Sequence, residues 1–134
     1  MKLTQREASY IINVIISELE KRDKQAVIAI ADSYGELLAF VRMENTKLHS
    51  INIAINKAWT AARAQKPTSE IGKSLKDSVK GYDISFYGDS KYTGFGGGVP
   101  IKVKDMVIGA VAVSGLSQEE DEEMAIIGIS SIYK

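Results

Sequence analysis

The sequence predicts an α+β domain in which helices cover both faces of an antiparallel sheet. Two pairs of short apolar segments are each joined by a tight turn, and such β-hairpins build antiparallel sheets. The segments 26–31 and 107–113 are apolar throughout, which is typical of strands buried on both faces. Helical stretches precede, separate and follow the hairpins, so we expect three layers, α/β/α.

The N-terminal part is predicted to be a helix followed by the first hairpin. Residues 4–23 begin with a Thr-x-x-Glu capping box and then repeat apolar residues at helical spacing. Residues 26–31 and 37–42 are the predicted strands. The turn between them, residues 32–35, has Asp and Gly at the positions that a type I turn prefers.

The middle of the chain is predicted to contain an alanine-rich helix over residues 50–65, capped by Ser50. Its small apolar face allows a close approach to the sheet. Pro67 ends this helix, because proline disfavours helical geometry in the residue before it. Thr68 is then expected to cap a short third helix.

The C-terminal part begins with an irregular segment that is rich in glycine and tyrosine. We expect residues 81–98 to form a loop with a short element around Ile84–Tyr87. Residues 99–104 alternate in polarity and residues 107–113 are apolar, which predicts the second hairpin. Ser117, with a glutamate three residues later, is expected to start the last helix.

Composition restricts the function classes. The 134 residues fit one domain, residues 1–134. With 17 basic and 17 acidic residues, the chain lacks the basic excess typical of nucleic-acid-binding proteins. It contains no cysteine, which excludes disulfides and thiolate metal sites. No apolar stretch is long enough to span a membrane and the first residues lack a secretory signal, so we expect a cytoplasmic protein with no nucleic-acid or membrane partner.

The most unusual motif is the turn Gly96-Gly97-Gly98, which Phe95 precedes. Consecutive glycines let the backbone approach a ligand closely, and their amides can form an anion-binding nest. The alternative is a tight, close-packed turn into the following strand. The motif is neither a P-loop nor a dinucleotide fingerprint, because the residues that define those motifs do not follow. Both interpretations stay open, with ligand binding favoured.

Three charged residues are further candidates for a binding site. Arg42 ends a predicted strand, and Lys57 lies on the flank of the alanine-rich helix. From there the Lys57 ammonium can bind a carboxylate in a pocket or extend into solvent, and we expect the solvated position. Asp121 lies in the first turn of the last helix, where a carboxylate interacts favourably with the helix dipole.

The sequence gives little support for metal binding or nucleophilic catalysis. His49 is the only histidine and has no ligand partner at a suitable spacing, so we expect a surface residue and no metal site. Ser114-Gly115 follows a strand, as a nucleophile would, but the G-x-S-x-G motif is absent. The aromatic residues Phe95, Tyr92 and Tyr87 can line an apolar pocket, stack on a flat ligand or fill a subunit interface.

Four segments, taken together and in order, resemble the GlcG/HbpS-like family, which is also called haem-degrading or PduO-C-terminal-like. They are Ala31–Met43, Ala54–Thr68, Gly96–Ile101 and Ile108–Glu122. The resemblance implies a profilin-like fold with an antiparallel sheet of about five strands, and homo-oligomers. Members occur beside glycolate-oxidation genes and in diol- and glycerol-utilisation clusters, and some bind haem or are linked to its degradation.

The resemblance also places residues on family motif positions, namely Arg42, Lys57, Thr60, Gly97, Gly98, Ser114, Gly115 and Asp121. It implies a non-enzymatic module that binds haem, a corrinoid or a small organic acid and serves a pathway such as glycolate or diol and glycerol utilisation. Phe95 and Gly96 complete the candidate ligand site, and haem is the candidate cofactor. One alternative is an enzyme or accessory acting on haem or a small carbonyl compound, with Lys57 as the reactive group because burial would lower its pKa. The other is an oligomeric scaffold subunit without a ligand.

Overall fold

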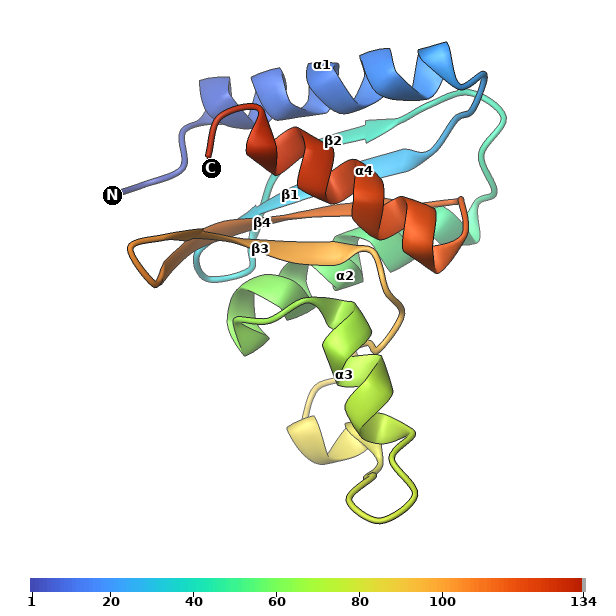
Figure 1. Cartoon of the computed structure of the whole chain (residues 1–134), viewed down its shortest axis with the longest axis vertical. Coiled ribbons are helices and arrows are strands. Elements are labelled where there is room, and N and C mark those ends of the chain that lie inside the picture. The colour runs from blue at the N-terminus through green and yellow to red at the C-terminus, as the bar shows by residue number, and fades with distance from the viewer. Residues whose placement is uncertain (134) are drawn as a thin grey trace.

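The computed structural model describes residues 1–133 and confirms the predicted α+β fold (Figure 1). Among these residues, no helix is both long and apolar enough to cross a membrane. The elements follow the expected order, and their bounds are α1 (Gln5–Lys21), β1 (Val27–Asp32), β2 (Leu37–Arg42), α2 (His49–Ala64), α3 (Thr68–Leu75), the 3-10 helix η1 (Ile84–Tyr87), β3 (Gly98–Val103), β4 (Met106–Ser114) and α4 (Gln118–Ser130).

The sheet is a four-stranded antiparallel sheet with the order β2-β1-β4-β3. β1 and β2 form the first hairpin, β3 and β4 form the second, and pairing of β1 with β4 joins them. The expectation of about five strands is therefore wrong for residues 1–133. The segment between α3 and β3 is a loop around η1, as predicted, because its closely spaced glycine and aspartate residues favour turns over an extended strand.

The two faces of the sheet carry side chains of different size. On one face, branched residues such as Ile28, Ile30 and Val111 pack against α1 and α4. On the other face, Ala29, Ala112 and their neighbours contact the alanine-rich helix α2, so the predicted close approach is confirmed. Strand geometry produces this difference, because successive residues point to opposite faces. Figure 1 shows α1 and α4 on one side of the sheet and α2 and α3 on the other, as expected for three layers.

Two of the four predicted helix caps are confirmed. Thr4 and Ser117 cap α1 and α4 with their hydroxyl groups, as predicted. Ser50 does not cap α2, because the helix begins one residue earlier and Ser50 lies buried in its first turn. Thr68 does not cap α3, because Pro67 occupies the cap position and the Thr68 hydroxyl accepts a hydrogen bond from the glycine turn instead.

Candidate functional site

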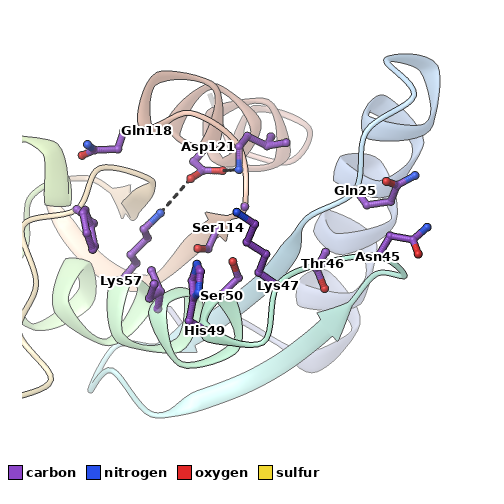
Figure 2. A pocket seen from close by; sticks show the side chains of 14 residues that line it. Gln25, Asn45, Thr46, Lys47, His49, Ser50, Lys57, Ser114, Gln118 and Asp121 are labelled. Carbon is purple, nitrogen blue, oxygen red and sulfur yellow. Dashed lines mark hydrogen bonds and ion pairs between the residues drawn. The ribbon is translucent and has the colours of Figure 1, made fainter.

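A cavity of about 350 Å³ lies where the start of α2, the end of β4 and the start of α4 meet (Figure 2). Pockets for small molecules typically have volumes of about 300–1,000 Å³, so a small ligand fits. Residues that the sequence singled out line this cavity, namely Lys57, Phe95, Ser114, Gly115 and Asp121. The fold therefore brings together residues from α2, β4, α4 and the loop before β3, which are distant in the sequence.

Lys57 and Asp121 form an ion pair inside the protein, and each residue is only 2% exposed. Lys57 Nζ donates to Asp121 Oδ2 at 3.1 Å and to the Val113 carbonyl oxygen at 3.0 Å. The Leu116 N–H donates to Asp121 Oδ1 at 3.0 Å and so fixes the carboxylate. The predicted solvated position of Lys57 is therefore wrong. Small neighbours bring α2 close to the sheet, and the lysine stem runs inward to a carboxylate that α4 supplies.

Burial shifts the protonation equilibria of this pair. It lowers the pKa of Lys57 and raises the pKa of Asp121, because water no longer stabilises either charge. The charge of each partner and the hydrogen bond between them oppose these shifts and are the smaller effects. Both shifts favour the neutral forms of the two groups relative to those of an exposed ion pair.

The backbone amides at the two ends of the glycine turn are used inside the protein. The Gly96 N–H donates to Gln118 Oε1 at 2.7 Å, and the Gly98 N–H donates to Thr68 Oγ1 at 3.0 Å. These amides are not free to bind an anion, so the predicted nest is wrong for them. These two contacts favour the alternative, a close-packed entry into β3, and ligand binding by the turn stays a prediction.

Gly97, the central residue of the turn, lies against the ion pair. Its φ is +131°, a conformation that favours glycine. A Cβ at this position would lie 2.7 Å from Lys57 Nζ and 2.6 Å from the Val113 carbonyl oxygen. The missing side chain leaves the room that the ammonium group occupies. Gly97 thus shapes the site by packing and does not need to touch a ligand.

Thr68→Val tests how far the turn depends on its buried hydrogen bond. Valine keeps the shape of threonine but leaves the buried Gly98 amide without its acceptor, which costs about 1–3 kcal/mol. We expect urea denaturation to show a loss of unfolding free energy of that size. Thr93→Val is the matched control. The Thr93 hydroxyl accepts a hydrogen bond from the Phe95 N–H at an exposed position, where water can replace the hydroxyl as acceptor. Equal losses in the two variants would contradict this role of Thr68.

The structure separates two other predicted residues from the cavity. Thr60 is fully buried, and its hydroxyl accepts the Thr93 N–H and donates to the Lys91 carbonyl oxygen, both at 3.2 Å. It therefore anchors the loop that precedes the glycine turn. Arg42 is exposed at the end of the edge strand β2 and is not among the residues that line the cavity. Gly115, by contrast, lines the cavity and directly follows β4, with a φ of +124°.

Sequence reasoning missed several residues of the cavity wall. Ser50 and Ile53 line it beside the predicted Lys57, and the i, i+3, i+7 spacing of the three residues was the available signal that they share one helix face. Two further residues line the cavity near the start of α2: Lys47 precedes the helix, and His49 is its first residue. His49 is exposed, as predicted, but its imidazole borders the cavity (Figure 2). Among residues 1–133, no three His, Cys, Asp or Glu side chains group to hold a metal ion.

The aromatic residues of the loop divide between two locations. Phe95 lines the cavity and is 53% exposed. Tyr92 instead packs edge-on against Trp59 and Tyr87, with ring centroids 4.6 Å and 4.7 Å apart. Tyr87 and Tyr92 therefore stabilise the loop and do not line this cavity.

Comparison with known proteins identifies similar chains along nearly the whole length. A family model described as "Haem degrading protein HbpS-like" matches residues 3–130. Protein GlcG of Escherichia coli strain K12 is 36% identical over 112 residues, which are 84% of this chain and 81% of GlcG. The crystal structure of Klebsiella pneumoniae protein ORFY superposes with a TM-score of 0.91 at 26% identity, covering 100% of this chain and 94% of that one. The crystal structure of a PduOC:heme complex superposes with a TM-score of 0.91 at 25% identity, covering 98% of this chain and 96% of that one.

Proposed function

Since this chain belongs to the HbpS-like family of haem-degrading proteins, we propose that it is a small-molecule-binding module whose ligand enters the cavity beside Lys57 and Asp121. The ligand is haem, a corrinoid or a small organic acid, and the module serves a metabolic pathway in a non-enzymatic role. Only the acid fits wholly within about 350 Å³, so haem or a corrinoid would lie partly outside the cavity. The observation that carries this proposal is the cavity itself, which has a charged pair in its wall and a lysine and a histidine on its border.

The charges around the cavity favour an anionic ligand. Lys57 and Asp121 neutralise each other, whereas Lys47 is exposed and forms no ion pair among residues 1–133. The wall therefore has one cationic group in excess. A carboxylate on the ligand would gain a charge-assisted hydrogen bond from Lys47.

The side chains present are compatible with haem. His49 offers an imidazole, a usual axial ligand of haem iron, from an exposed position on the cavity wall. The half-exposed ring of Phe95 can pack against a flat macrocycle, and Lys47 can pair with a propionate. When bound, haem would supply iron-centred redox and ligand-binding chemistry, whereas this chain would bind and orient it. The structural similarity to a PduOC:heme complex supports haem as the first ligand to test.

A haemin titration of the purified protein, followed by absorbance, tests the proposal. We expect a saturable shift of the Soret band at about one equivalent of haemin. His49→Ala should weaken binding by at least about tenfold, the effect of about 1.4 kcal/mol of lost interaction. Lys102→Ala is the control, because Lys102 is exposed on β3 and is not among the residues that line the cavity.

The outcomes separate the parts of the proposal. A shift retained in His49→Ala would mean that haem binds through other groups. The absence of a saturable shift would exclude haem, and the same titration would then be made with a corrinoid and with glycolate. If none of these three ligands bound, the binding module as proposed here would be wrong.

A further inference from the structure

We propose that Lys57 is a nucleophile that forms a reversible imine with a small aldehyde or ketone bound in the cavity. This assignment rests on the cavity being the ligand site proposed above, and it names carbonyl compounds as a ligand class. It is carried by the place of Lys57 in the cavity wall, by its hydrogen bonds and by its pairing with a buried acid.

The burial of Lys57 is unusual for a residue of this type. Lysine is almost never fully buried unless it is paired with an acid, because desolvation of an ammonium group is costly. Lys57 is 2% exposed and still lines a cavity of small-molecule size. Lys47 lines the same cavity from an exposed position and provides an ordinary lysine for comparison.

The hydrogen bonds of Nζ leave one position for a reacting molecule. An ammonium group has three N–H donors, and Nζ has two protein acceptors among residues 1–133, Asp121 Oδ2 and the Val113 carbonyl oxygen. Once a proton has moved to Asp121, rotation about the Cε–Nζ bond can turn the nitrogen lone pair away from these acceptors. Because burial lowers the pKa of Lys57 and raises that of Asp121, this proton transfer is favoured relative to an exposed pair.

The reaction balances with the groups that are present. After the Lys57 ammonium has given a proton to Asp121, Nζ attacks the carbonyl carbon, and the C=O π electrons move to oxygen. Asp121 returns its proton to that oxygen and removes one from nitrogen, which gives a carbinolamine. Asp121 then protonates the hydroxyl group, which leaves as water while the nitrogen lone pair forms the C=N bond. The product is a protonated imine beside the Asp121 carboxylate, and no oxidant or reductant is consumed.

Neighbouring groups hold the reacting atoms in position. The Leu116 N–H fixes the Asp121 carboxylate, so the acid stays within hydrogen-bond distance of Nζ. Ser114 is 4% exposed and lines the same cavity, where its hydroxyl can donate to the carbonyl oxygen during attack. These contacts provide the positioning that an imine-forming lysine needs.

Reductive trapping tests the proposal on the intact protein. The protein is incubated with propionaldehyde and sodium cyanoborohydride, which converts an imine to a stable secondary amine, and modified lysines are located by peptide mass mapping. We expect Lys57 to be modified at least about tenfold faster than Lys47, because transfer of a proton to Asp121 frees the nitrogen lone pair of Lys57, whereas Lys47 has no such partner in the cavity wall. The Lys57 rate should saturate with aldehyde concentration, whereas lysines outside the cavity, such as Lys102, should react linearly. Lys57→Arg, which keeps a cation beside Asp121, should remove the fast saturable phase.

Two results would overturn the assignment. One is modification of Lys57 no faster than that of Lys47, and the other is a rate that rises linearly with propionaldehyde. Either result can occur while haemin still binds, in which case the binding function stands and the imine does not. Fast, saturable modification of Lys57 in a protein that binds no haemin would support the imine and contradict haem as the ligand.

Discussion

Lys57→Met is expected to lower the free energy of unfolding by about 3–5 kcal/mol, because it leaves a buried carboxylate without its partner. Methionine has nearly the length of lysine and fills most of the space, so a cavity contributes little to this loss. The remaining Asp121 can avoid an isolated buried charge only by binding a proton. Guanidinium denaturation, with the unfolding midpoint and slope fitted together, measures the effect.

The double variant distinguishes the cost of an unpaired charge from the contribution of the pair. Replacement of a buried ion pair by apolar residues of similar volume is often nearly neutral, so Lys57→Met combined with Asp121→Leu should recover part of the loss. Recovery will be incomplete, because the Leu116 N–H loses its acceptor. Lys47→Met is the matched control and should change stability by no more than about 0.5 kcal/mol, since Lys47 is exposed. A Lys57→Met loss as small as that of Lys47→Met would contradict the description of a buried, coupled pair.

Local sequence signals predicted most of the elements of this fold. The capping boxes, the alternation of β3 and the stop at Pro67 are properties of a few consecutive residues, and they placed α1, α4 and the hairpins within a few positions of their observed bounds. The alanine-rich face of α2 likewise predicted its close packing on the sheet. The loop over residues 81–98 was likewise predicted from its glycine-rich composition. The expectation of about five strands came instead from the family resemblance and not from these local signals.

The site was harder to predict because its contacts join distant parts of the chain. Lys57 is buried beside Asp121, which lies 64 positions later in the chain. No local spacing in the sequence indicates that these two residues form an ion pair. Thr68 was expected to cap a helix, yet it binds the turn amide of Gly98, 30 positions away. His49 was correctly expected at the surface. Its position beside the cavity depends on the start of α2 lying close to the end of β4, which local sequence signals do not indicate. The homo-oligomer and the cytoplasmic location stay predictions.

Gly97→Ala is expected to be among the most destabilising single-methyl additions in this protein. The residue has a φ of +131°, and a side chain in such a conformation costs about 1–3 kcal/mol. The added Cβ would also lie 2.6 Å from the Val113 carbonyl oxygen, which belongs to the backbone of a central strand and cannot easily move. Crowding of this kind adds about 1–3 kcal/mol. Denaturation curves should therefore show a loss of several kcal/mol.

Gly88→Ala is the comparison for the two contributions. Gly88 also has a positive φ, +86°, but a Cβ there would meet no atom within 4 Å, so this variant bears the conformational cost alone. The excess loss in Gly97→Ala therefore combines the crowding beside Lys57 Nζ and the Val113 carbonyl oxygen with the higher conformational cost of its φ of +131°. If the alanine at position 97 displaces Nζ from Asp121, trapping of Lys57 by propionaldehyde should slow even at temperatures where the variant is folded. Equal losses of stability in the two variants would mean that the turn has room for a side chain, and that the glycine is needed there for its conformation and not to make space for the lysine.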